Sequence, residues 1–165
     1  AVSTPHLAAE LFKTMAKITL LHVPYKGTGP AVVAVVSGES QVVFPAASPA
    51  LPHVRAGRLR ALGICSLARS EAAPDLPTIA ESGLKGYESA QWYGVMVPVR
   101  TPAAIVQRLN AELVKIVNSS SMRARLLKDA TSVVDDTSAK GFGVYLRAEI
   151  VKWREVVKFS GARVE

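Results

Sequence analysis

Short apolar runs alternate with helix-like segments early in this 165-residue chain, and this alternation constrains the fold more than any other feature. The runs at 18–23, 41–44 and 59–65 have the length and the turn-forming flanks typical of buried strands. Helix-like segments at 31–36 and 48–55 lie between them. Strands joined by helical crossovers pair in parallel, and such connections are right-handed. We therefore predict an α/β fold with a parallel sheet.

The loop that follows the first of these runs carries the residue types of an anion site. Proline fits the first position of a helix, so Pro30 marks the expected helix start. In an open α/β sheet such loops lie where ligands bind, and the free N–H groups of a helix start favour an anion. Glycine and proline also occur in such loops for turn geometry alone. The candidate ligand residues are Tyr25, Lys26, Gly27, Thr28 and Gly29.

Two further helix starts have the same character. Ser3 and Thr4 precede a proline, and His6 then falls in the first turn of the helix. Ser48 also precedes a proline. These hydroxyls would serve equally as simple caps. In a parallel sheet, however, the three helix starts would gather along one edge, so we predict that they form one anion site.

The charge balance excludes some partners. The net charge is +7 and the isoelectric point is near 9.8, which alone would permit attraction to nucleic acid. The basic residues are scattered, however, and no helix-turn-helix or zinc pattern occurs, so we predict no nucleic-acid partner. The apolar runs are shorter than the roughly 18 residues of a membrane span. The opening A-V-S-T-P-H lacks the features of a signal peptide.

The chain also lacks the residue sets of an enzyme. An enzyme needs a nucleophile with its base, or a group of metal ligands. His6, His22 and His53 lack metal-ligand spacing, and no G-x-S-x-G motif occurs. Cys65 is the only cysteine, and its apolar surroundings predict a small buried side chain. We therefore expect no catalytic residue, no metal and no cofactor.

The second half of the chain has more helix than strand. An irregular stretch at 66–86 contains Thr78 and Glu81 at the spacing of a capping box. Strands are predicted at 89–99 and 131–134. Helices are predicted to begin near Thr101, Ser121 and Thr137. Two strands are too few to cover these helices, so we expect part of the sheet to be missing from this chain.

Several motifs follow one another along nearly the whole chain. They are H-V-P-Y-K-G-x-G-P-A at 22–31, A-A-S-P-A-L-P-H-V-R-A-G-R-L-R-A-L-G at 46–63, R-S-E-A-A-P-D-L-P-T-I-A-E-S-G at 69–83, W-Y-G-V-M-V-P-V-R-T-P at 92–102, N-A-E-L at 110–113 and the S-G-A-R-V-E terminus. Together they resemble the Bug proteins, the extracytoplasmic substrate receptors of tripartite tricarboxylate transporters. Their number and order make the resemblance specific.

The resemblance implies a periplasmic-binding-protein-like fold of type 2, a two-lobed Venus flytrap. Residues 1–86 would form most of the second lobe, with its parallel sheet, and 87–165 the returning C-terminal part of the first lobe. The family normally has a long N-terminal portion before the point where this chain starts. The resemblance therefore implies a fragment whose first lobe is incomplete. An incomplete lobe leaves room for a dimer or for strand exchange between copies.

The function implied by the resemblance is capture of a small carboxylate in the periplasm for membrane transporter subunits. The ligand would be a di- or tricarboxylate, an amino acid or an aromatic acid. The family often has an acidic residue where this chain has Pro45, which favours a simple carboxylate over an amino acid. The alternatives are a ligand-sensing effector domain of a transcription regulator and, less favoured, a small enzyme. The positions that match the family's cleft are Ser3, Thr4, His6, Tyr25 to Gly29 and Ser48.

Overall fold

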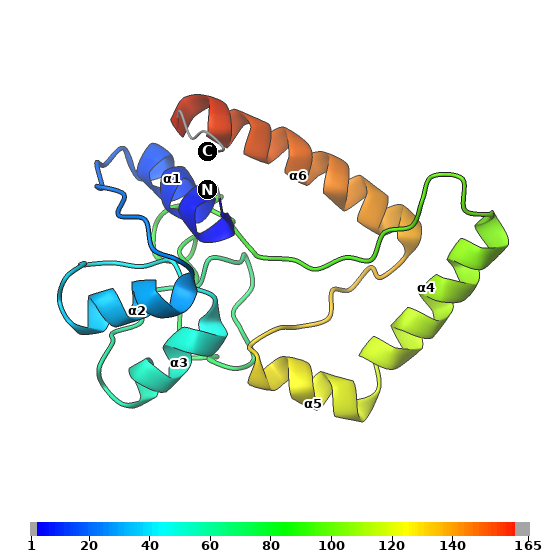
Figure 1. Cartoon of the computed structure of the whole chain (residues 1–165), viewed down its shortest axis with the longest axis horizontal. Helices are drawn as coiled ribbons and strands as arrows, with labels where there is room; N and C mark the ends of the chain where they lie inside the picture. Colours follow the sequence, from blue (N-terminus) through cyan, green and yellow to red (C-terminus); the bar gives the residue numbers. More distant parts are fainter. Residues whose placement is uncertain (1–2, 161–165) are drawn as a thin grey trace.

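The structure, a computed structural model, describes residues 3–160, and this part of the chain contains six α-helices (Figure 1). They are α1 (Thr4–Ala16), α2 (Thr28–Val36), α3 (Ala47–Arg55), α4 (Ala103–Val117), α5 (Ser120–Lys128) and α6 (Ala139–Ser160). The helix predictions are confirmed, with small shifts of boundary. Thus α2 begins at Thr28 instead of Pro30, and α3 begins at Ala47 instead of Ser48.

The segments predicted as strands do not form a sheet among residues 3–160. They run as extended chain, and the one bridge described joins Ile64 to Thr78 in parallel. In the segment 90–97, no backbone group takes part in a described backbone hydrogen bond. Tyr93 is 79% exposed and Val99 is 100% exposed. Strands are stable when neighbouring strands pair with their backbone, and no described element pairs with the backbone of this segment. The predicted parallel sheet is therefore not observed.

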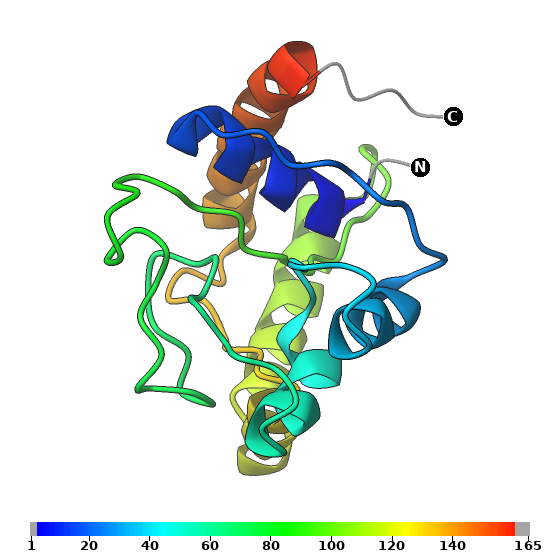
Figure 2. The same cartoon turned by 90° about the vertical axis from the view of Figure 1, so that its left-hand side faces the viewer.

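A fully buried tyrosine fixes α1 to the middle of the chain. The hydroxyl of Tyr87 donates to the carbonyl of Ala8 at 3.0 Å and lies 3.7 Å from the sulfur of Cys65. Phe12 of α1 packs edge-on against Tyr87, with 5.9 Å between the ring centroids. Burial raises the pKa of the Tyr87 hydroxyl and that of the half-buried Cys65 thiol. Helix α1 also packs against α6 (Figure 2).

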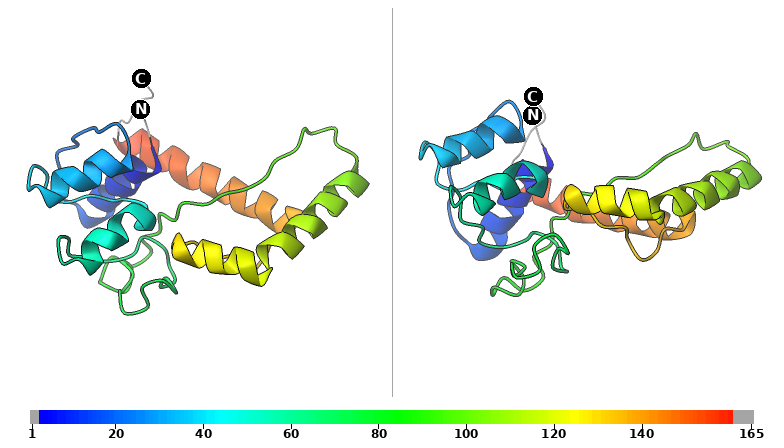
Figure 3. Two further views of the ribbon diagram at one scale, coloured as in Figure 1. Left: turned by 60° about the horizontal axis from the view of Figure 1, so that its bottom comes forward. Right: turned by 90° about the horizontal axis from the view of Figure 1, so that it is seen from below.

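Helices α4 and α5 and the beginning of α6 form an arm that extends away from α1, α2 and α3 (Figure 3). The long helix α6 connects the two parts, because it packs against α1 and also against α4. Asn110 of α4 donates a hydrogen bond to the carbonyl of Thr137, just before α6, at 2.8 Å. None of the helices in the described part of the chain is both long enough and apolar enough to cross a membrane.

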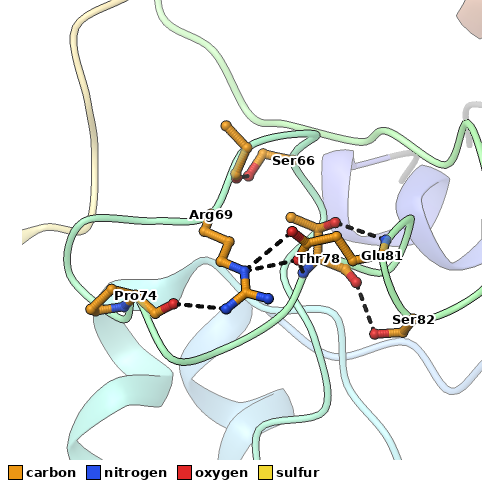
Figure 4. Close-up of polar contacts among 7 residues, drawn as sticks. Ser66, Arg69, Pro74, Thr78, Glu81 and Ser82 are labelled. Atoms are coloured by element: carbon orange, nitrogen blue, oxygen red, sulfur yellow. Dashed lines mark hydrogen bonds and ion pairs between the residues drawn. The ribbon is translucent and has the colours of Figure 1, made fainter.

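The predicted capping box forms in the irregular stretch. The N–H of Thr78 donates to the carboxylate of Glu81 at 2.8 Å, and the Thr78 hydroxyl accepts from the N–H of Glu81 at 3.0 Å. Arg69 binds the same carboxylate at 2.9 Å (Figure 4). The bond from the Thr78 N–H, with Arg69 adding to it, lowers the pKa of Glu81. This cluster holds the turn after residue 78 although no helix continues from it.

Candidate functional site

The first turns of α1, α2 and α3 all lie toward the centre of the molecule (Figures 1 and 3). Helices α2 and α3 also pack against each other. The predicted ligand residues are distributed over these turns: Ser3, Thr4 and His6 at α1, Gly27, Thr28 and Gly29 at α2, and Ser48 as the second residue of α3. The structure thus brings the three helix starts to one region of the molecule.

The backbone N–H groups of these three turns are not capped by side chains. No side-chain hydrogen bond caps α1, α2 or α3 within the described residues, and none of the three has an acidic residue in its first turn. Helix α4 is likewise uncapped, whereas in α5 the Ser119 hydroxyl accepts from the N–H of Met122 at 3.4 Å. Free N–H groups give a helix start a partial positive charge. The three turns can therefore donate hydrogen bonds to an anion.

The loop before α2 contributes its backbone and one charge. Gly27 has a φ of +107°, a backbone conformation that residues other than glycine rarely adopt because of their Cβ atom. Lys26 forms no ion pair with a carboxylate in the described chain. Tyr25 is held elsewhere, because its hydroxyl donates to Glu39 at 3.0 Å and lies 3.0 Å from the hydroxyl of Ser40, beyond the end of α2. The Lys26 ammonium group therefore has no carboxylate partner in the described chain, whereas the Tyr25 hydroxyl already has hydrogen-bond partners.

A pair of stacked histidines joins α1 to this loop. The rings of His6 and His22 lie 4.0 Å apart between centroids, with 18° between their planes. Nε2 of His6 lies 3.6 Å from the buried carboxylate of Glu10, which Lys13 contacts at 2.8 Å. Burial, followed by the influence of His6, lowers the pKa of His22 from its ordinary value of 6.5. His22 was not among the predicted ligand residues, although it opens the motif at 22–31.

Two surface hollows are described, and both lie away from the starts of α1, α2 and α3. One open hollow lies between α3 and residues 73–76, and another lies beside the first turn of α6. Neither is lined by a predicted ligand residue. Within residues 3–160 no cluster of three or more His, Cys, Asp or Glu side chains is placed to hold a metal ion. The candidate site is therefore identified by the backbone N–H donors of the three helix starts, and not by a described hollow or a metal-ligand cluster.

Comparison with known sequences identifies relatives along the whole chain. The family model described as "Tripartite tricarboxylate transporter family receptor" (TctC) matches residues 1–161. Protein BugT of Bordetella pertussis is 34% identical over 165 residues, which cover 99% of this chain and 50% of BugT. A protein from the tcbD–tcbE intergenic region of Pseudomonas sp. strain P51 is 35% identical over 92% of this chain and 45% of its own length. The chain spans about half the length of these relatives.

Solved structures agree with this comparison. The R. palustris protein Rpa4515 with adipate has a TM-score of 0.78 and 33% identity, and the match covers 96% of this chain and 53% of that one. MatC from Rhodopseudomonas palustris with bound malate has a TM-score of 0.75 and 31% identity, over 94% and 53% of the two chains. The periplasmic binding protein BugD has a TM-score of 0.72 and 26% identity, over 98% and 54%. These similarities support a fold of the periplasmic-binding-protein type.

The two comparisons confirm the resemblance to the Bug proteins that the sequence motifs indicated. The matched family consists of receptors and not of enzymes. This chain belongs to the tripartite tricarboxylate transporter receptor family.

Proposed function

We propose that this chain carries part of the carboxylate site of an extracytoplasmic receptor that serves the membrane subunits of a tripartite tricarboxylate-type transporter. The observation that carries this proposal is the group of three uncapped helix starts without acidic residues. The similar structures with adipate and malate support a small dicarboxylate as the ligand class. Family membership and the likeness to a periplasmic binding protein support the periplasm as its location.

In this proposal, backbone and hydroxyl groups hold the ligand. The N–H groups of Thr28 and Gly29 donate to one carboxylate, and those of the first turn of α1, at Ser3, Thr4 and His6, lie ready for a second. The hydroxyls of Thr28 and Ser48 add further bonds. Bonds to a charged acceptor are stronger than neutral ones, but desolvation of the ligand offsets much of the gain. Neutral donors therefore suit a receptor that must also release its ligand.

The first test removes the hydroxyls. The double variant Thr28→Ala, Ser48→Ala is expected to bind adipate or malate about thirtyfold more weakly, because each lost hydrogen bond contributes about 1 kcal/mol. Isothermal titration with adipate, malate, citrate and glutamate measures this. The exposed Ser132 serves as the control, and Ser132→Ala should leave affinity unchanged. Equal affinity of the double variant and the unaltered chain, or no heat with any of the four acids, would refute the site.

We further propose that the chain contributes to two lobes, with 1–86 in one and 87–165 in the other. The exposed segment 93–97 supports this proposal, because an apolar segment with a free backbone fits a sheet that another polypeptide segment completes. The match covers only 53% of the adipate-bound structure, so nearly half of that fold lies outside the matched part. Closure of the lobes on the ligand would use a hinge near 86–93.

The second test supplies the missing strands in trans. The half of BugT that this chain does not match, added as a separate polypeptide, is expected to form a one-to-one complex and to raise the strand signal in circular dichroism above the sum of the parts. Val95→Lys should weaken the complex at least tenfold, because it places a charge in the new sheet. Leu127→Lys on α5 is the control. Absence of a complex would contradict the proposal. A dimer of this chain alone would also contradict it, if Val95→Lys converts that dimer to monomers.

A further inference from the structure

We propose that the stacked His6–His22 pair is a pH-sensitive latch that positions the loop at 25–29 against the first turn of α1. The latch is closed while at most one ring carries a proton and opens when both rings are protonated. In this role both histidines are positioning residues, and neither ring needs to touch the ligand. The link to ligand affinity rests on the proposed carboxylate site, whereas the latch itself does not.

The position of the pair gives it this role. His6 lies in the first turn of α1, and His22 lies three residues before Tyr25, with Val23 and Pro24 between them. The stack, with 4.0 Å between ring centroids, joins α1 directly to the chain that enters α2. Proline restricts the backbone at position 24, so a displacement of His22 would be passed on to the loop.

The geometry of the stack disfavours a proton on both rings at once. Two protonated rings would place like charges about 4 Å apart, which opposes stacking. Glu10 can accept from one nitrogen of His6, but Lys13 already contacts both of its carboxylate oxygens, at 2.8 and 3.0 Å. The other nitrogen of His6, Nδ1, is buried without a hydrogen-bond partner in the described residues, so a proton there would have no acceptor.

The direction of the pH effect follows from His22. Burial, His6 and Lys13 lower its pKa, and Glu10 acts in the opposite direction with less effect than burial. The unfolded chain therefore binds a proton at His22 more readily than the folded chain does. The contribution of this ring to stability is fully present above pH 6.5 and falls as the pH drops through the ordinary histidine range toward the lowered pKa. Acidification thus acts against the closed latch.

The experiment compares rings that titrate with rings that do not. In the unaltered chain, NMR signals of the His6 and His22 rings should titrate in two coupled steps separated by about one pH unit or more. In His22→Phe the flat ring remains but carries no proton, so His6 should titrate in one step and the melting temperature should lose part of its pH dependence. His22→Ala should lose the stack at every pH. His53→Gln is the control, because His53 lies on α3 outside the pair.

Affinity for adipate provides the functional measurement. Between pH 7.5 and 5.5 the unaltered chain should lose about fivefold more affinity than His22→Phe. The comparison cancels the titration of adipate itself. Independent titration of the two rings would overturn the latch even if adipate binds. An affinity that rises on acidification only when both rings are present would also overturn it, because the rings would then attract the anion directly. Coupled ring titration without any adipate binding would uphold the latch and reject the carboxylate site.

Discussion

Replacing Glu149 with alanine is expected to lower the free energy of unfolding by about 3 kcal/mol. Glu149 is 5% exposed, and its carboxylate accepts from the indole N–H of Trp92 at 3.3 Å and from that of Trp153 at 2.8 Å. Lys152 forms one ion pair with this carboxylate and a second with Glu88. Without Glu149, two indole N–H groups lose their acceptor at the contact between α6 and the segment 92–99. Urea unfolding followed by tryptophan fluorescence measures the change.

A second carboxylate on the same helix provides the control. Glu155 is exposed and forms no ion pair in the described chain, so Glu155→Ala should change stability by about 0.5 kcal/mol or less. Burial, with Glu149 and Glu88 adding to it, raises the pKa of Tyr145 to about 12. Glu149→Ala should therefore also lower the pKa of Tyr145 in an alkaline titration. Equal stability of the Glu149 and Glu155 variants would show that this network contributes little.

Replacing Gly94 with valine is expected to destabilise the chain by about 3 kcal/mol, and Gly94→Ala by about 2 kcal/mol. A Cβ atom at this position would lie 2.9 Å from Cε1 and Cε2 of Phe142 and closer still to Cζ. The Phe142 ring packs edge-on against Trp92, with 5.6 Å between centroids, so it has little freedom to withdraw. The added side chain would push the segment 92–99 away from α6. Thermal or urea unfolding measures the loss.

The neighbour of Phe142 on α6 tests whether tight packing is the cause. At Gly143 an added Cβ would have only an ordinary contact, 3.7 Å from the guanidinium of Arg147, so Gly143→Ala should be neutral or stabilising in a helix. Combining Gly94→Ala with Phe142→Leu should recover part of the lost stability, because the smaller side chain makes room. Similar stability of the Gly94→Ala and Gly143→Ala variants would contradict the packing explanation.

The helices and the receptor class could be predicted from the sequence. Helix signals are local: Pro5 and Pro49 lie in first turns, and Gly57 follows α3 with a φ of +67°. The capping box at Thr78 and Glu81 is equally local, since its two reciprocal bonds span three residues. Family membership followed from the order of several motifs, which does not depend on how the segments pack.

Only the tertiary structure decided which distant residues meet. On sequence alone, Glu149 is one more charge on an amphipathic helix, yet its partner Trp92 lies 57 residues away. His6 and His22 stack because the chain returns along α1, and Tyr25 turns from the predicted site because Glu39 and Ser40 lie within reach. The strand patterns show the converse, since pairing needs neighbours and the described residues supply only one bridge, between Ile64 and Thr78. Local conformation is encoded within a few residues, whereas burial and strand pairing depend on the path of the whole chain.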